Sequence, residues 1–301
     1  MNLPTNTLYA VSLERKLARL ENWQRLRRRP GFIIGAVISL FWVVCAILGD
    51  KITPHDPLTY TTRPKLSPRS GHWFGTDKIG RDVFSRVLAG ARDVLLVAPA
   101  AAVLGVILGT ILGMIMGYRR GWIDLFLSRI VEALLSLPVI LIGLLILTLA
   151  DTSPFLGAIT FHSRKVLVIY VVALLFTPIV ARTVRSAVIG ERELEYVTSA
   201  KLRGETGAFI MSREILPNIM GPIIVELTVR IGYAIFTVST LSFLGVGIQR
   251  PSPDWGLAIS DGRDLLRANV WWPVTFPALA IATLVIGVNL IADSIQSVYE
   301  R

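Results

Sequence analysis

Six long stretches of this chain contain no Asp, Glu, Lys or Arg, and they restrict its fold more than any other feature. Each is close to the ~17–25 residues that a helix needs to cross the hydrocarbon of a bilayer. Because no water is available there to bind backbone groups, such stretches must form helices. The sequence therefore predicts an all-α integral membrane protein with six spans, at 32–49, 94–118, 133–150, 166–181, 231–249 and 270–292.

The composition excludes a soluble globular protein. Only 17% of the residues are charged and 53% are hydrophobic, with a mean hydropathy of +0.60, whereas soluble domains carry about a quarter charged residues. The net charge of +10 does not indicate nucleic-acid binding, because Lys and Arg collect at the ends of the spans, where they fix topology and meet anionic headgroups. The single cysteine, Cys45, lies inside the first apolar stretch, so neither a disulfide nor a cysteine-based metal site is expected.

The chain divides into an N-terminal tail (1–31), a first span (32–49), an outer segment (50–92) and a core (93–301). Arginines at 25 and 27–29 precede the first span, which favours a cytoplasmic N-terminus, and six spans return the C-terminus to the same side. The first span begins too late for an ordinary cleaved signal peptide and is expected to be a retained anchor. Leucines at roughly helical spacing within the tail fit either a helix on the membrane surface or a solvated tail.

Glycine recurs every four residues in the second span, at Gly105, Gly109, Gly113 and Gly117. This spacing places all four on one helix face and lets a second backbone approach closely in lipid. The pattern indicates helix packing rather than a ligand site.

The longest connection predicted on the cytoplasmic side runs from about 182 to 218, which is far more than two neighbouring helices need. Its apolar spacing suggests two short amphipathic helices, with Gly204 and Gly207 in the turn between them and Pro217 ending the second. An apolar-faced hairpin of this kind requires a partner to cover it.

Three motifs carry a resemblance to a known family. Tyr196-Val197, Ser199-Ala200, Gly204 and the run 215–218 resemble the EAA loop of binding-protein-dependent ABC importers. The runs HWFGTDKIGRDVFSR (72–86) and LSFLGVGIQRPSPDWG (241–256) are similar to the same group. Together they resemble the C-type permease of the dipeptide, oligopeptide and nickel importers, over about residues 30–298.

The resemblance implies a six-helix bundle of the type I ABC importer permease kind in a bacterial inner membrane. It implies that the cytoplasmic loop couples to a separate ATPase, through Tyr196, Ser199, Ala200, Gly204, Gly207, Phe209, Leu216 and Pro217. It also implies three kinds of partner, namely a homologous second permease, two ATPase subunits and an extracytoplasmic binding protein. The sequence itself contains no Gly-x-x-x-x-Gly-Lys-Ser/Thr loop, so ATP and Mg²⁺ are expected on the partner subunits, with no cofactor on this chain.

Some positions depart from the family pattern. Thr198 replaces the usual acidic residue of the loop signature, and Glu214 stands where a basic or apolar residue is commoner. Relatives often carry a carboxylate in the middle of the fifth span, where this chain has Thr237. The substrate is therefore left open among di- or oligopeptides, the first choice, and nickel chelates, glutathione-like compounds or other small solutes.

Charged and polar residues near the spans are candidates for the translocation pathway. Glu226 and Arg230 are one helical turn apart and can pair. If the fifth span begins near Ile219, Arg230 lies near mid-membrane; if it begins near Ile231, both residues anchor the inner surface. The Pro-Asn end of the loop favours the first alternative. The further pathway candidates are Thr237, Asn289 and Asp293.

The outer segments offer a second candidate site, for docking or gating beneath a binding protein. Its residues are Asp77, Arg81, Asp82 and Trp255. Asp77, Arg81 and Asp82 can also pair within their own loop, so a self-satisfied loop is the alternative, and we expect a mixture of the two roles.

Two other classes of function are disfavoured. A membrane-embedded enzyme would have to use His55, His72 and His162, which fall in outer loops without a His-Glu-x-x-His helix, so no catalytic residue and no metal site are predicted. A secondary transporter would need charged relay residues at mid-membrane, and the chain offers little beyond Glu226 and Arg230.

Overall fold

The computed structural model describes residues 26–60, 63–152 and 163–299. Within these ranges, all regular secondary structure elements are helices. The tail leucines before residue 26, and His162, lie outside the described residues. Among the residues described, five helices are each long and apolar enough to cross a membrane, and a bent pair forms a sixth span if it is counted as one. These helices are α2 (Pro30–Ile52), α3 (Val83–Tyr118), the bent pair α4 (Trp122–Leu135) and α5 (Val139–Thr152), α7 (Arg164–Glu191), α11 (Met220–Phe243) and α13 (Trp272–Tyr299).

Within the described residues, six shorter helices lie between the spans. They are α8 (Glu195–Leu202), α9 (Gly207–Phe209), the π-helix η1 (Ile210–Ile215), α10 (Leu216–Asn218), α12 (Trp255–Gly262) and the 3₁₀-helix η2 (Arg263–Ala268). The segment from α8 to α10 is called the hairpin below. Residues 53–82 together with α12 and η2 are called the loop layer.

The third predicted span, 133–150, is not one straight helix. The chain bends by 91° between α4 and α5. Pro138 stands directly before α5 and has no backbone N–H, and it disfavours the helical conformation at the residue before it. Ser136 adds to the break, because its hydroxyl donates to the carbonyl of Ala133 at 2.7 Å. The third span was predicted from its apolar composition, which does not reveal this bend.

The fifth span also differs from its apolar stretch, because α11 begins at Met220 rather than near Ile231. Arg230 therefore lies near the middle of a 24-residue helix. The start of α11 agrees with the first of the two alternatives for Glu226 and Arg230, and the position of Arg230 in the membrane stays a prediction.

The glycine pattern of α3 packs against α7, as predicted. A Cβ atom added at Gly109 would lie 2.5 Å from Cβ of Val180, and one added at Gly117 would lie 2.6 Å from Cβ of Val188. Added Cβ atoms at Gly105 and Gly113 would meet carbonyl oxygens of α7 at 2.9 and 2.6 Å. The absence of side chains at these four positions sets the distance between the two helices.

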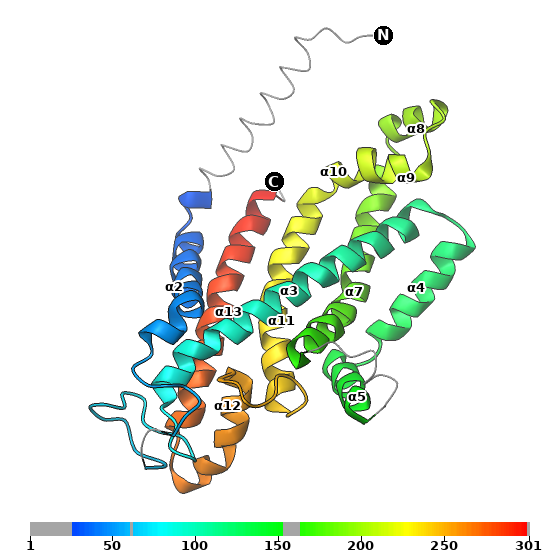
Figure 1. Cartoon of the computed structure of the whole chain (residues 1–301). Coiled ribbons are helices and arrows are strands. Elements are labelled where there is room, and N and C mark those ends of the chain that lie inside the picture. Colours follow the sequence, from blue (N-terminus) through cyan, green and yellow to red (C-terminus); the bar gives the residue numbers. More distant parts are fainter. Residues whose placement is uncertain (1–25, 61–62, 153–162, 300–301) are drawn as a thin grey trace.

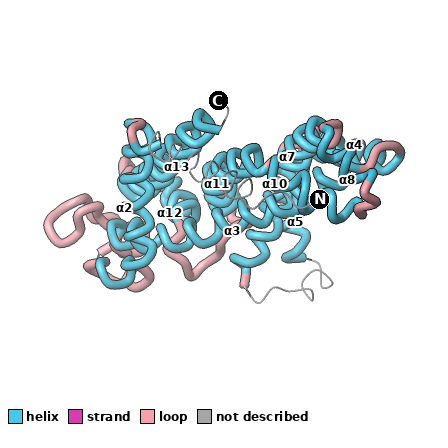
Figure 2. The backbone as a smooth tube through the Cα atoms, turned by 90° about the horizontal axis from the view of Figure 1, so that it is seen from above, coloured by secondary structure: helices cyan, strands magenta, loops and turns pink. Residues whose placement is uncertain are grey.

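The helix α3 is the longest element and crosses the others obliquely, from the side of α2 to the side of α4 (Figure 1). It contacts α2, α13, α11, α7 and α4 in turn. Viewed from above, α2 and α4 lie at opposite ends of the assembly of helices (Figure 2). This crossing makes α3 the element that links most of the spans.

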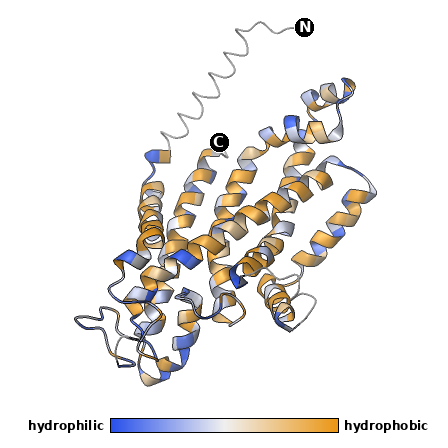
Figure 3. Ribbon diagram, viewed as in Figure 1, coloured by the Kyte–Doolittle hydropathy of each residue, from blue (hydrophilic) through white to orange (hydrophobic). Residues whose placement is uncertain are grey.

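The two ends of the molecule differ in character. The start of α2, the end of α13 and the hairpin lie at one end, and the loop layer lies at the other (Figure 1). Between the ends, the helices are mostly hydrophobic along their length (Figure 3). In α2, Val37 and Ile47 are 63% and 74% exposed, as expected of side chains that face lipid.

Candidate functional site

The hairpin is a compact helical unit that projects beyond the spans. Gly204 takes a positive φ of +78° in the turn after α8, a conformation that glycine adopts without strain. Gly207 starts the second helix, because the hydroxyl of Thr206 accepts from the N–H of Phe209 at 3.3 Å. Two sequence predictions are corrected here. Gly207 does not lie in the turn, and Pro217 does not end the second helix, since the only interruption before α11 falls at Ile219.

The interior of the hairpin is apolar and packs on α7. Val197 and Ala200 are fully buried against Ile210 and Ile215 of the second helix, in one cluster with Val188 of α7. Ala200 was predicted to contact the ATPase, but its side chain packs inside the hairpin. The same cluster includes Met114 of α3 and Ile223 of α11, so the hairpin packs against the ends of three spans.

The outer face of the hairpin carries the accessible members of the predicted coupling set. Ser199, Gly204, Phe209 and Pro217 are exposed, whereas Tyr196, Gly207 and Leu216 are half-buried. Leu202, which the coupling prediction did not include, is 85% exposed. At ~100° per residue, Leu202 is turned about 140° from Val197 around α8, so the spacing that buries Val197 turns Leu202 outward.

Polar contacts tie the hairpin to two spans. Just before the hairpin, the guanidinium of Arg192, the C-cap of α7, donates to the carbonyl of Gly117 in α3 at 2.6 Å and joins these two spans. Within the hairpin, the Nζ of Lys201 lies 5.8 Å from the ring centroid of Tyr118, at the end of α3. The hydroxyl of Tyr196 donates to Glu191, at the end of α7, at 2.5 Å. Burial and the bond to Glu191 raise the pKa of Tyr196 to about 12, so it remains a neutral donor. The hairpin is therefore bonded to α7, contacts the end of α3 and continues through α10 into α11.

Within α11, Glu226 and Arg230 form an ion pair near the middle of the span. The Nε of Arg230 donates to Glu226 at 2.9 Å, and the hydroxyl of Thr183 in α7 donates to the other carboxylate oxygen at 2.8 Å. The guanidinium also lies 5.2 Å from the ring centroid of Tyr233. Each charge is shielded, with side-chain exposures of 12% and 14%, and each has partners, as intramembrane charges require.

A cavity of about 380 Å³ lies between α11 and α13. Asn289 and Asp293 of α13 line it, together with Gly232 and Tyr233 of α11. The two helices come close there, because a Cβ atom added at Gly232 would lie 2.4 Å from the side-chain oxygen of Asn289. The structure thus brings two predicted pathway residues into one cavity. Thr237, a third predicted pathway residue, is buried and does not line this cavity.

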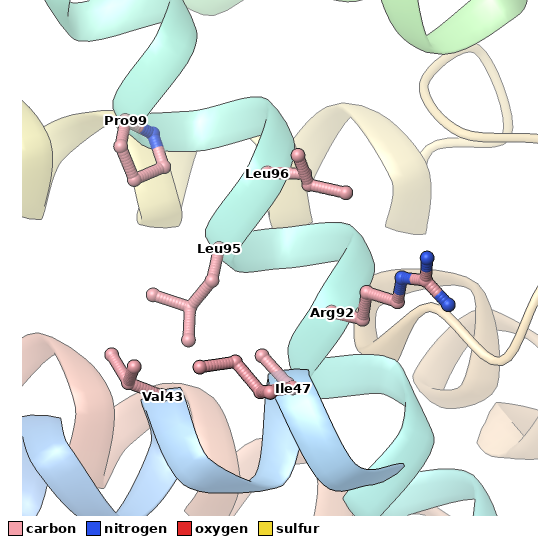
Figure 4. Close-up of a pocket in the computed structure, with 7 residues that line it drawn as sticks. Val43, Ile47, Arg92, Leu95, Leu96 and Pro99 are labelled. Atoms are coloured by element: carbon pink, nitrogen blue, oxygen red, sulfur yellow. The ribbon is translucent and has the colours of Figure 1, made fainter. Parts of the chain in front are cut away.

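A groove of about 560 Å³ lies between α2 and α3 (Figure 4). Its lining is apolar except for Arg92, and it includes Ile47, one of the lipid-facing side chains of α2. None of the predicted pathway residues lines it. This groove therefore opens on the apolar exterior, away from the polar residues of α11 and α13.

The predicted outer docking residues form the interior of the loop layer. Asp77, Arg81, Asp82 and Trp255 are all at most 6% exposed. Arg81 pairs with Asp77 at 2.6 Å and with Asp261 of α12 at 3.3 Å. The docking role expected for these four side chains is corrected, because all four are buried and bind within the layer or to α3.

Trp255 attaches this layer to α3, and two buried carboxylates bind donors around α12. The indole of Trp255 donates to the carbonyl of Val87 in α3 at 2.8 Å. Asp254 caps α12 by accepting from the N–H of Leu257 at 2.8 Å, and burial raises the pKa of Asp254 to about 6. Burial tends to raise the pKa of Asp261 as well, but hydrogen bonds from Arg250 and Lys78 outweigh it and lower that pKa.

Comparisons with known proteins agree over nearly the whole chain. Residues 109–301 match the family model described as binding-protein-dependent transport system inner membrane component, and residues 20–68 match the N-terminal TM domain of oligopeptide transport permease C. The dipeptide transport system permease protein DppC of Bacillus subtilis is 38% identical, over 91% of this chain and 82% of its own length.

Two further relatives carry different substrate names. A putative peptide transport system permease protein of Brucella suis is 37% identical, over 92% of this chain and 90% of its own length. The glutathione transport system permease protein GsiD of Escherichia coli is 36% identical, over 92% of this chain and 88% of its own length.

Proposed function

This chain belongs to the binding-protein-dependent transport system inner membrane component family, as a C-type permease of the peptide ABC importers, and we propose that separate ATPase subunits drive it through the hairpin. It is a multi-pass membrane protein and the permease component of an importer. The observation that carries the proposal is the hairpin itself, a helical unit that packs on the ends of the spans, with an outward apolar side chain at Leu202, a bond to the end of α7 and a contact with Tyr118 at the end of α3.

The coupling is mechanical in this proposal. An ATPase that grips the outer face of the hairpin displaces it as a rigid body, a common way of switching between two states. Because α10 leads almost directly into α11, the displacement reaches the span that carries Arg230 and one wall of the cavity with α13. The movement then widens or narrows the polar cavity, which gates the pathway.

The substrate class follows from the relatives' names and from the chemistry of the cavity. A carboxylate (Asp293), an amide (Asn289) and a phenol (Tyr233) line the cavity beside apolar side chains. Such groups can bind the ammonium and amide groups that all peptides share, with little selection among side chains. We propose di- or oligopeptides or similar small solutes as the cargo.

The remaining parts of the assembly are proposed from family membership. A second permease of similar fold completes the pathway, two cytoplasmic ATPases bind ATP and Mg²⁺, and an extracytoplasmic protein delivers the solute. The chain acts as a transport subunit without its own ATPase site. In this arrangement both termini and the hairpin face the cytoplasm, in agreement with the arginines at 27–29 before α2.

The proposal is tested with Leu202→Glu in the complete transporter, reconstituted in sealed vesicles with its binding protein. Because the Leu202 side chain is 85% exposed, the variant should reach the membrane at normal levels but lose at least tenfold in ATP-dependent peptide uptake. Leu266→Glu is the matched control, since Leu266 is 48% exposed in η2 at the opposite end. Normal coupled uptake by Leu202→Glu, or uptake driven by a proton gradient without the ATPases, would contradict the proposal.

A further inference from the structure

Three side chains that can bind a metal meet where α3 begins. His55 follows the end of α2, His72 lies in the 53–82 segment of the loop layer, and Asp82 is the N-cap of α3. One ligand atom from each lies within 4.8 Å of the other two. The sequence suggested no metal site, because the histidines are far apart in the chain and match no ligand motif; the fold places two of them side by side.

The distances suit a small divalent ion. The Nδ1 of His72 lies 2.8 Å from Oδ1 of Asp82, and the Nδ1 of His55 lies 4.0 Å from Oδ2 of the same carboxylate. Zinc bonds of ~2.0–2.2 Å in a tetrahedron place neighbouring ligand atoms about 3.3–3.5 Å apart. That spacing falls between the two measured distances, so modest side-chain shifts bring one ligand atom of each residue to a single ion.

An unsatisfied atom points to the same place. The Nδ1 of His55 is buried and has no hydrogen-bond partner among the described residues. A buried polar atom without a partner destabilises the fold. The carboxylate of Asp82, only 1% exposed, is the acceptor beside it. A cation between these groups would satisfy the imidazole nitrogen and neutralise the buried carboxylate together.

The surroundings of Asp82 already hold it in place. The backbone N–H and the hydroxyl of Ser85 each donate to Oδ2 of Asp82 at 2.8 Å. The backbone N–H of His55 donates to the same hydroxyl at 3.2 Å. Hydrogen bonds of this kind orient the ligands of metal sites and are part of their affinity.

We propose that His55, His72 and Asp82 bind one divalent transition-metal ion of the Zn²⁺ type. Two imidazoles with one carboxylate favour such an ion over Mg²⁺ or Ca²⁺, which prefer oxygen ligands. Both rings bind through Nδ1, so each carries its proton on Nε2. The His55 side chain is 32% exposed, which leaves a path for the ion and a fourth position for water.

The ion would connect three parts of the chain that are distant in sequence. It joins the end of α2, the loop at His72 and the first turn of α3, on the face of the molecule opposite the hairpin. Its role is therefore structural, and it does not depend on the coupling proposed for the hairpin.

The test uses the complete purified transporter, stripped with a chelator and titrated with Zn²⁺ alone, with bound metal and the thermal unfolding midpoint as readouts. We expect a single chelator-sensitive site on this chain and a midpoint that rises with zinc concentration, because an ion that binds only the folded state stabilises it. His55→Ala should weaken binding at least tenfold, and so should Asp82→Asn, which keeps a capping oxygen. Asp264→Asn, an exposed carboxylate of the same layer, is the matched control and should bind normally.

His55→Ala removes a partly exposed side chain, so it tests the ligand without creating a cavity in the core. Replacement of Zn²⁺ by Co²⁺ adds a spectroscopic signature, since Co²⁺ bound to two imidazoles absorbs differently from the free ion. No stoichiometric binding to the stripped protein would overturn the proposal, and so would equal zinc affinity in wild type and His55→Ala. ATP-dependent uptake is measured separately, so failure of the metal site leaves the transport function standing.

Discussion

The contact between α3 and α7 gives the sharpest test of how the bundle is held together. We consider Gly109→Ala, which adds one methyl group at the centre of the glycine face. The new Cβ would lie 2.5 Å from Cβ and 2.8 Å from Cγ1 of Val180, and 2.9 Å from the carbonyl oxygen of Thr177. Valine in a helix has one strongly preferred rotamer, and the carbonyl belongs to the backbone, so neither neighbour can turn away. The helices must separate.

The expected cost follows from overpacking. Extra methyl groups in a well-packed interior cost about 1–3 kcal/mol. Alanine is also a better helix former than glycine by about 0.8–1.0 kcal/mol, which partly hides that cost. Gly190→Ala serves as the control, because Gly190 lies in α7 and an added Cβ there meets nothing within 4 Å. The gain in helix propensity largely cancels between the two variants. The difference between their free energies of unfolding, about 1–3 kcal/mol, therefore reports the packing alone.

Equilibrium unfolding of the purified chain in mixed micelles, with increasing denaturing detergent, measures this difference. We expect Gly109→Ala to unfold first and Gly190→Ala to unfold at or beyond the wild-type midpoint. Equal midpoints for the two alanine variants would refute the close approach of α3 and α7 at Gly109. Membrane insertion should be normal in both, because neither substitution adds a polar group.

Two further predictions concern buried charges. Burial raises the pKa of Asp254 to about 6. As the pH falls from about 6 to about 4, the folded protein therefore binds this proton before the unfolded chain does, and the free energy of unfolding rises. Asp254→Asn should remove this rise in unfolding midpoints measured across that range, and a variant with the wild-type pH profile would contradict the prediction. Arg230→Gln should leave Glu226 unpaired near mid-span. We expect at least a fivefold fall in the folding equilibrium constant and in the rate of uptake, without loss of assembly. The double variant with Glu226→Gln should recover the stability, and equal stability of the single and double variants would count against the pair.

The sequence by itself determined the class of fold and the family. The charge-free stretches depend only on the composition of each segment, and a segment's transfer into lipid is a local property, so the predicted helices appear without knowledge of their neighbours. The glycine spacing of α3 is equally local, because it fixes one helix face, and the expected close packing is present at Gly109 and Gly117. The family motifs are also read directly from consecutive residues.

Only the tertiary structure decided how polar groups are used. Ala200 and Leu202 lie two residues apart, yet one is buried and the other is 85% exposed, because the second half of the hairpin covers only one side of α8. Asp77 and Arg81 are buried rather than presented for docking, because Asp261 arrives from a distant helix to pair with Arg81. The partner of a charge depends on which remote segments pack beside it, and the sequence order of those segments does not contain that information.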